Sequence, residues 1–355
     1  MKSVLQRDGL KTVQRIAIPF GILLFALLVL LPGSARSEGK FSGYMLGDYY
    51  YVISHNNSAL ENQNGFWFRR IYFTYDYEIT DEWKSRFRLE LNSPGDFKTK
   101  DTIKPYIKDA YLAWKKRDTN LSLILGMSSS PAYEYIENFW GYRAVERTAL
   151  DLYKMEPSRD LGIALKGAID KAQKVSFHLF VGNGQGTNSE LNKEKKFSGS
   201  LLFQPQRNIS IEFFTDYSKE EPNKAITTYQ GFLGWKNDKG RIGAQFSHQI
   251  LQQGVGKADL KVNVGSLFGV LKAAEKISVL GRVDRVSKAL PWASGITYSP
   301  FNSTAPFTMV LAGIDYSPTK NVKILPHIMT AMYDETNGVK PDTDTYFRMT
   351  CYWSF

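Results

Sequence analysis

Basic residues recur at every second position of one short segment of this chain. Within residues 82–93, Lys84, Arg86 and Arg88 alternate with apolar or small side chains. Successive side chains of a β-strand point to opposite faces, so a strand here would gather the positive charges on one side. Fixed positive charge between low-dielectric walls concentrates anions and repels cations. The segment therefore suggests electrostatic selection of solutes.

Other kinds of chemistry have little support in the sequence. The histidines His55, His178, His248 and His327 are scattered, and no nucleophile motif accompanies them. We therefore predict no catalytic residue, although the presence of Ser, His and acidic residues keeps an enzyme open as a less favoured alternative. The only cysteine, Cys351, cannot form an internal disulfide.

Two loop-like segments resemble binding motifs without matching them. Residues 182–186 form a glycine-rich run, but no helical pattern follows, so we predict a turn and not a phosphate loop. The acidic stretch 334–344 misses the spacing of a calcium-binding EF-hand. We predict a solvated acidic loop there, and no metal or cofactor in the protein.

The elements that must position the charges are predicted to be β-strands. Runs with a period of two, rich in aromatic and β-branched residues, recur along the chain. The sixteen predicted strands span residues 41–55, 66–80, 82–93, 105–117, 120–128, 160–170, 174–183, 196–205, 208–218, 226–236, 240–251, 259–271, 276–287, 306–317, 321–334 and 343–355.

The connections between these strands alternate in length. Those after even-numbered strands are tight turns, and most of those after odd-numbered strands are longer, with the longest at 129–159. This alternation is typical of an up-and-down transmembrane β-barrel, and an even number of strands returns both ends to one side. The predicted fold class is therefore all-β, a transmembrane antiparallel barrel of about sixteen strands. We expect its long third extracellular loop, with Phe139, Trp140 and Tyr142, to fold into the lumen.

The faces of the strands favour a membrane barrel with a polar interior. Arginine on the lipid face near the bilayer midplane costs about 2–4 kcal/mol, so Arg86 and Arg88 should point inward. A soluble sandwich would place the same charges outside, and strand pattern alone does not separate the two. The residues predicted to line the pore and set anion selectivity are Arg70, Lys84, Arg86, Arg88, Arg282 and Arg348 from strands, and Arg143 and Arg147 from the long loop.

The two ends of the chain decide between these folds. A basic stretch, an apolar run over 16–31 and small residues around 32–37 are typical of a secretory signal peptide. We predict cleavage after Ser37, or alternatively after Ala35, which leaves residues 38–355 as one barrel domain. Residues 345–355 alternate and stop on Phe355, like the closing strand of bacterial outer-membrane barrels.

The net charge of the chain indicates which kinds of partner it could bind. The chain has 45 basic and 35 acidic residues, a net charge of +10. Residues 1–37 hold five of the basic residues and one of the acidic ones, so 40 and 34 remain, a net charge of +6. This excess favours anionic partners such as lipopolysaccharide phosphates. Nucleic acid is not expected for an exported chain without a basic and aromatic motif.

Several motifs resemble the phosphate-selective porin O and P family. They are Phe68-Arg69-Arg70-Ile71-Tyr72, Trp83-Lys84-Ser85-Arg86-Phe87-Arg88-Leu89-Glu90, Ile107-Lys108-Asp109-Ala110-Tyr111-Leu112-Ala113-Trp114, Leu125-Gly126-Met127, Pro157-Ser158-Arg159-Asp160-Leu161-Gly162-Ile163 and Val181-Gly182-Asn183-Gly184. The resemblance covers residues 41–355 and is densest before residue 190. It implies a sixteen-stranded, homotrimeric diffusion channel in the bacterial outer membrane, surrounded by lipid and lipopolysaccharide.

The function expected from the sequence is passive diffusion of small hydrophilic solutes with an anion preference, which phosphate could share. Two further points stay open. The inward charges could pair with acidic residues and leave a weakly selective pore. The barrel could also be a gated transporter or a sheath around a partner protein. A sheath would need a lumen that is free of the long loop.

Overall fold

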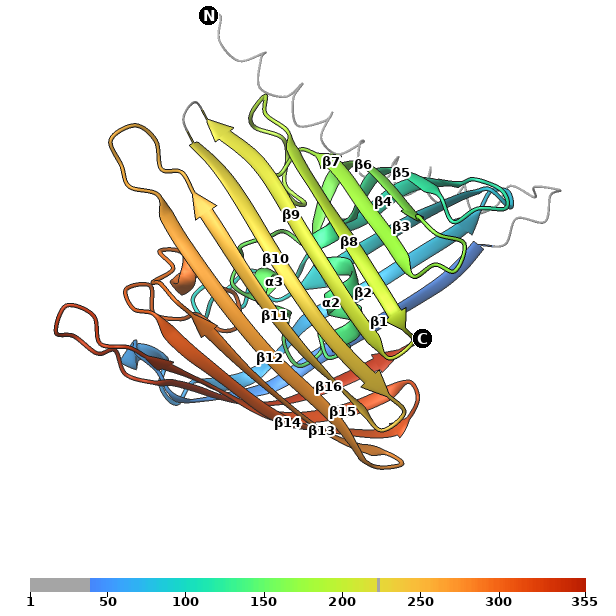
Figure 1. Ribbon diagram of the computed structural model, residues 1–355. Helices are drawn as coiled ribbons and strands as arrows, with labels where there is room; N and C mark the ends of the chain where they lie inside the picture. Colours follow the sequence, from blue (N-terminus) through green and yellow to red (C-terminus); the bar gives the residue numbers. More distant parts are fainter. Residues whose placement is uncertain (1–38, 222–223) are drawn as a thin grey trace, which may run out of the picture. The chain divides into compact units, whose positions relative to one another are not determined.

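The computed structural model describes residues 39–221 and 224–355, and these form a closed antiparallel β-barrel (Figure 1). Within these residues sixteen strands pair in sequence order, and β1 pairs with β16 to complete the ring. The predicted fold class is confirmed. The predicted signal peptide, residues 1–37, and the first residue of the predicted barrel domain lie outside the described residues.

The strand boundaries lie within three residues of those expected from the sequence. The strands are β1 Gly39–Ser54, β2 Asn64–Glu78, β3 Trp83–Asn92, β4 Lys104–Lys115, β5 Ser122–Ser129, β6 Arg159–Ala168, β7 Val175–Gly182, β8 Lys196–Gln206, β9 Ile209–Glu221, β10 Lys224–Asn237, β11 Gly240–Leu251, β12 Leu260–Ala274, β13 Ile277–Val286, β14 Phe307–Thr319, β15 Val322–Tyr333 and β16 Asp344–Ser354. The short helices are η1 Ser58–Leu60, α2 Pro131–Trp140, α3 Ala149–Leu152 and η2 Ala293–Gly295.

The connections keep most of the expected alternation. We call one end of the barrel the short-turn end; there the turns are 79–82, 116–121, 169–174, 207–208, 238–239, 275–276 and 320–321. The opposite end is the long-loop end. It has one exception, because β9 and β10 extend further than expected and continue to Glu221 and Lys224. Those two residues form an ion pair of 2.7 Å, which extends the paired region.

Closure of the ring depends on backbone hydrogen bonds that continue to Phe355. The amide of Gly43 donates to the carbonyl of Phe355, and the amide of Phe355 donates to the carbonyl of Gly43, both at 3.0 Å. Pairing of β1 with β16 leaves no open sheet edge, which is the arrangement that hydrocarbon requires of a β-structure. In the described part of the chain, no helix has the length and apolar character to cross a membrane.

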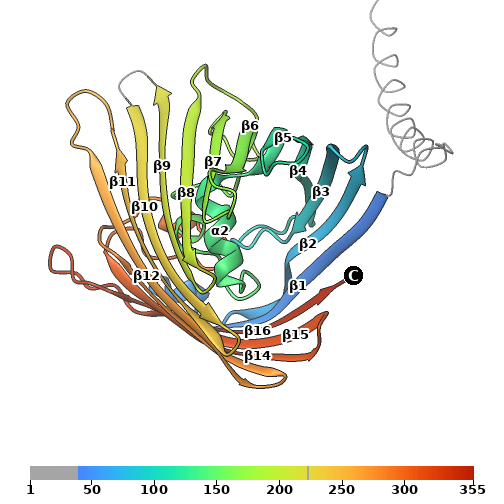
Figure 2. The ribbon, with the colours of Figure 1, turned by 45° about the vertical axis from the view of Figure 1, so that its right-hand side comes forward.

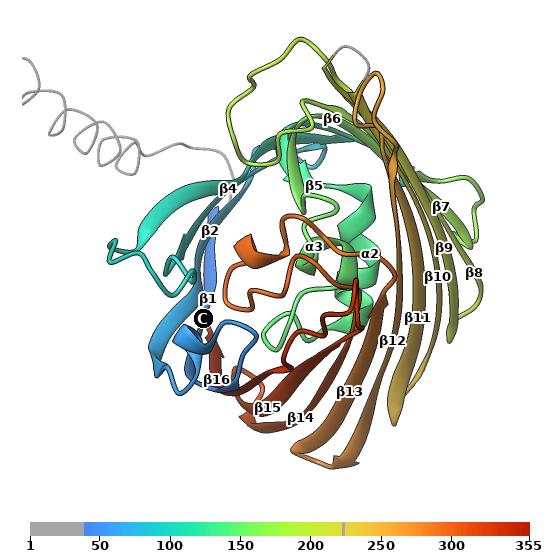
Figure 3. The ribbon, with the colours of Figure 1, turned by 90° about the vertical axis from the view of Figure 1, so that its left-hand side faces the viewer.

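The segment 130–158 between β5 and β6 lies inside the ring, where α2 is visible in Figure 2 and both α2 and α3 are visible in Figure 3. Helix α2 packs against the inner wall at β7–β10. The rings of Phe139 and Trp140 contact Phe268, an inward residue of β12. The loop 287–306 also turns inward and buries Leu290, Ile296 and Phe301.

The interior is less polar than the sequence pattern predicted. Strands β12–β15 carry apolar residues on the inward face as well as the outward one, including Val264, Phe307, Met309 and Leu325. These side chains form one hydrophobic cluster with the two inserted loops. The expectation of a polar interior is therefore wrong for this side of the barrel. The two loops supply the apolar partners that keep these inward side chains out of water.

The topology predicts which loops a reagent outside the cell can reach. In a Cys351→Ser background, single cysteines at Leu191 and Ser294 should react with a membrane-impermeant maleimide on intact cells. Both positions are exposed on long loops. A cysteine at Asp238, in the turn 238–239, should react only after lysis. Equal labelling at all three positions in intact cells would contradict the assignment of the two ends.

Candidate functional site in the barrel lumen

Helix α2 has a local sequence that explains its start and its end. Pro131 occupies the first turn, where its missing N–H costs nothing. Gly141 ends the helix in the left-handed conformation at φ 68°, which a residue without a Cβ adopts readily. Arg241 of β11 then donates a 2.8 Å hydrogen bond to the carbonyl of Trp140, and so ties the end of the helix to the wall.

A buried group of charges holds the middle of the loop against β1, β2 and β16. Arg69 forms an ion pair with Asp48 at 2.5 Å and donates to the carbonyls of Ala144 and Val145, the latter at 2.9 Å. It also donates to the hydroxyl of Thr350 at 3.0 Å. We call this group, together with Glu146, the anchor cluster. It links the loop to the strands that close the ring.

Glu146 is the loop residue whose charge attaches the loop to the anchor cluster. Its carboxylate lies 3.3 Å from Arg147 and 3.5 Å from Arg348. Burial alone would raise the pKa of Glu146, but Arg147, Arg348 and Arg69 outweigh it and hold the pKa below its usual value. The carboxylate is therefore ionised, and it neutralises guanidinium groups that would otherwise be buried unpaired.

A second group of charges, which we call the wall cluster, lies between the loop and β2–β4. Glu90 accepts from Arg70 at 3.2 Å and from Lys108 at 3.0 Å. Asp109 lies 3.1 Å from Arg88. On the loop side, Arg143 is 2.5 Å from Asp151.

An aromatic ring of the loop adds to the wall cluster. The guanidinium groups of Arg143 and Arg159 lie over the ring of Tyr133, at 4.8 and 4.9 Å from its centroid. Cation–π contacts of this kind contribute about 0.5–2 kcal/mol each. They hold two guanidinium groups close together on the loop side of the wall cluster.

Each of the eight residues predicted to set anion selectivity has a carboxylate partner within 2.5–3.5 Å. The pairs are Arg70–Glu90, Lys84–Glu78, Arg86–Asp76, Arg88–Asp109, Arg143–Asp151, Arg147–Glu146, Arg282–Asp284 and Arg348–Glu146. This pairing is the alternative that the sequence analysis left open, in which the inward basic residues pair with acidic ones. A net effect of these residues on ions would therefore depend on small imbalances between the two signs of charge.

The eight predicted residues also differ in how far their side chains are exposed to solvent. The side chains of Lys84, Arg86 and Arg88 are 51, 31 and 18% exposed, whereas those of Arg282 and Arg348 are 1% exposed. The two buried residues also donate to the loop carbonyls of Arg147 and Tyr298. Their contacts attach the loops, and no passing ion could reach them without displacing these contacts.

Two lumen cations, Arg69 and Lys108, escaped the sequence analysis because each lies at a β-bulge. Strict alternation would point both toward lipid. The register shifts between Leu46 and Gly47 opposite Arg69, and between Arg88 and Leu89 opposite Lys108. A bulge inserts one residue and turns its side chain, so consecutive charged residues can share one face. The sequence could have indicated that both side chains face the lumen, because a charge that faces lipid at either position would be costly.

The histidines and the cysteine considered in the sequence lie in separate parts of the barrel. His178 faces the lumen, His327 is buried, and His248 bonds Asn263 on the outer face at 2.6 Å. Among residues 39–221 and 224–355, no group of three or more His, Cys, Asp or Glu side chains is placed to hold a metal ion. Cys351 is exposed on the outward face of β16.

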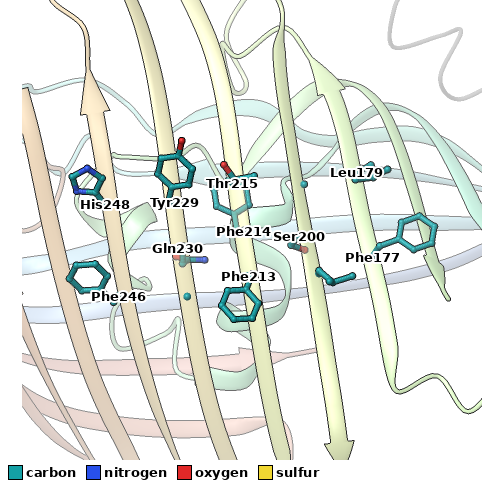
Figure 4. Close-up of a pocket in the computed structure, with 13 residues that line it drawn as sticks. Phe177, Leu179, Ser200, Phe213, Phe214, Thr215, Tyr229, Gln230, Phe246 and His248 are labelled. Atoms are coloured by element: carbon teal, nitrogen blue, oxygen red, sulfur yellow. The ribbon is translucent and has the colours of Figure 1, made fainter. Parts of the chain in front are cut away.

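A large hollow on the barrel lies on the outer wall, away from the charged lumen. It has a volume of about 620 Å³, and Figure 4 shows the side chains of Phe177, Phe213, Tyr229 and Phe246 around it. Gly231 leaves room at its floor, because an added Cβ there would meet nothing within 4 Å. The apolar lining suits contact with hydrocarbon and not with a hydrophilic solute.

Comparison with known proteins supports the fold. No family model matches the sequence, and no curated protein matches it. An anion-selective porin from Comamonas acidovorans superposes with a TM-score of 0.67 over 90% of this chain and 100% of its own, at 9% identity. The outer membrane channel DcaP of Acinetobacter baumannii gives 0.64 over 92% and 99%, at 13% identity. OmpF of Salmonella typhi, in complex with daunomycin, gives 0.62 over 89% and 97%, at 10% identity.

At these identities the likeness is one of fold. The chain has the fold of bacterial outer-membrane porins, a closed sixteen-stranded antiparallel barrel. Membership of the phosphate-selective O and P family stays a prediction.

The anchor cluster predicts a large effect of one substitution. Arg69→Leu should destabilise the barrel by about 3–5 kcal/mol, because it leaves the buried carboxylate of Asp48 without its cation. Thermal unfolding in detergent and trypsin cleavage within 143–147 would measure the effect. Lys84→Met breaks an exposed pair with Glu78 and should cost at most about 1 kcal/mol. Equal effects of the two substitutions would show that Arg69 does not anchor the loop.

Proposed function

We propose that this protein is an outer-membrane diffusion channel for small hydrophilic solutes. The observation that carries the proposal is a closed barrel whose lumen holds charged side chains and an inserted loop. A sheath around a partner protein would need this space, but the loop 130–158 and its attachments at Arg69 and Arg241 occupy it. The loop therefore favours a channel over a sheath.

The proposed path runs beside the charged walls, because the β12–β15 side is filled by apolar side chains. The loop residues Tyr133 and Arg143 lie at the wall cluster, to which Arg88 belongs, and the accessible Arg86 precedes Arg88 by two residues on the same face of β3. We place the narrowest part of the channel between this face of the loop and β2–β4. Solutes would there meet both signs of charge at short range, which favours small polar molecules over large or apolar ones.

The proposed selectivity is a modest preference for anions. Near the short-turn end a cavity of about 360 Å³ is lined by Arg143, Lys320 and Lys323, with Glu137 as its acidic lining residue. Asp315 lies 3.1 Å from Lys323 and offsets its charge, but Arg241 nearby bonds a carbonyl and not a carboxylate, so its charge adds to the excess. The paired charges elsewhere in the lumen dilute this preference, and phosphate would be one of many permeant anions.

Export through a signal peptide at 1–37, residence in the bacterial outer membrane with lipid and lipopolysaccharide as neighbours, and assembly as a homotrimer belong to the same proposal. One structure with this fold, OmpT of Vibrio cholerae, is described as a trimer form and superposes with a TM-score of 0.61 at 9% identity. Such a chain needs no cofactor for passive diffusion. Cross-linking of the protein in native membranes would test its assembly.

The pairing of the charges sharpens the test of selectivity. An Arg86→Ser, Arg88→Ser double variant should move the reversal potential under a KCl gradient toward cation preference, because Asp76 loses Arg86 and Asp109 keeps only Arg159. The matched control is Arg86→Ser with Asp76→Ser, which removes a whole pair and should leave the reversal potential close to that of the wild type. Cation preference in the wild type, or no shift in the first variant, would refute the assignment.

The position of the loop predicts a change in conductance. Deleting residues 135–145 removes the end of α2 and the ring contacts of Phe139 and Trp140 with the wall. Single-channel conductance in a planar bilayer should then rise, since the lumen becomes wider. Heat-modified mobility on a gel would confirm that the shortened barrel still folds. A folded variant with wild-type conductance would place the narrowest part elsewhere.

A further inference from the structure

A separate polar cavity lies inside the barrel between α2 and strands β6–β9. Its volume is about 340 Å³, and residues of the turns 116–121 and 169–174 also line it, so it belongs to the short-turn end. The side chains that matter for its chemistry are Glu134, Lys166, His178, Ser200 and Glu212. They come from the helix and from four neighbouring strands, and they converge on one space.

The two carboxylates of this cavity differ in their partners. Glu134 pairs with Lys166, which balances its charge. Glu212 has the hydroxyl of Ser200 as a hydrogen-bonding neighbour, and among the described residues no Lys or Arg lies within ion-pair distance of it. It is only 2% exposed. The cavity therefore contains one buried carboxyl group without a cation beside it among the described residues, and its ionised form is expensive unless a positively charged ligand binds there.

Two buried atoms in the cavity have no hydrogen-bond partner among the residues that the structure describes. They are Oε2 of Glu212 and Nε2 of His178, whose side chain is also more than nine-tenths buried. The Nδ1 of His178 lies 3.5 Å from the carboxylate of Glu134, which favours the tautomer with the proton on Nδ1. In that tautomer Nε2 is an acceptor. Both unpartnered atoms then require hydrogen-bond donors.

We propose that this cavity binds the primary ammonium group of a small solute. An ammonium group supplies a positive charge for Glu212 and three N–H donors, enough for Glu212, His178 and the hydroxyl of Ser200. A neutral alcohol offers one donor and no charge, and a quaternary ammonium offers charge without donors. The cavity should therefore bind a primary ammonium in preference to a neutral alcohol or a quaternary ammonium. The site is independent of the anion preference proposed above, because it uses other residues and does not require conduction.

Binding can be measured without a working channel. Saturation-transfer difference NMR on the full barrel in a non-ionic detergent would use n-butylammonium, n-butanol and tetramethylammonium as probes. We expect saturation transfer to n-butylammonium at concentrations where the other two probes give only the signal seen with protein-free micelles. Equal transfer to all three probes, or none to n-butylammonium, would overturn the proposal.

Two variants locate the site. Glu212→Gln keeps the size of the side chain and removes its charge, and it should weaken n-butylammonium binding at least tenfold. Glu78→Gln removes an exposed carboxylate near the rim and should leave binding unchanged. If Glu212→Gln fails to fold by heat-modified mobility, His178→Phe tests the second acceptor and should also weaken binding. Wild-type affinity in a folded Glu212→Gln or His178→Phe protein would contradict the assignment.

Discussion

The structure depends first on a closed ring of backbone hydrogen bonds. Because β1 pairs with β16, no strand edge remains open, and every strand has one inner and one outer face. An open edge in hydrocarbon would leave peptide groups without partners, at a cost of several kcal/mol each. The ring also encloses a space narrow enough that side chains and inserted loops meet across it. The contacts of the loops and the pairing of the charges follow from that enclosure.

Within the ring, the protein uses two kinds of filling. On the β12–β15 side, apolar residues such as Phe307 and Met309 pack against the loops 130–158 and 287–306 as in the core of a soluble protein. On the β1–β4 side, cations and carboxylates pair across strands and onto the loop. The first filling packs the β12–β15 side of the lumen, and the second gives the proposed path a wall whose charges almost cancel. A nearly balanced wall selects solutes by size and polarity more strongly than by charge.

Two places in the lumen depart from this balance of charge. Lys320 and Arg241 leave an excess of positive charge near the short-turn end, where Lys323 is paired with Asp315, while Glu212 has no cation beside it among the described residues on the other side of α2. One helix thus separates two small cavities of opposite character. A solute with both an acidic and a basic group would find a partner for each, which connects the proposed anion preference with the proposed ammonium site without making either depend on the other.

The sequence by itself determined the class of fold, the number of strands and their boundaries to within three residues. It could do so because the period of two and the lengths of the turns are local properties of the chain. It also indicated that residues 129–159 form a long loop with aromatic residues able to pack inside. Only the tertiary structure decided which charges are free. Arg86 faces Asp76 and Arg88 faces Asp109 across strand registers, and Arg69 and Lys108 turn inward at bulges that alternation does not reveal. Neutralisation is a property of pairs distant in the chain, as in Arg348 with Glu146, so a count of basic residues along single strands could not predict it.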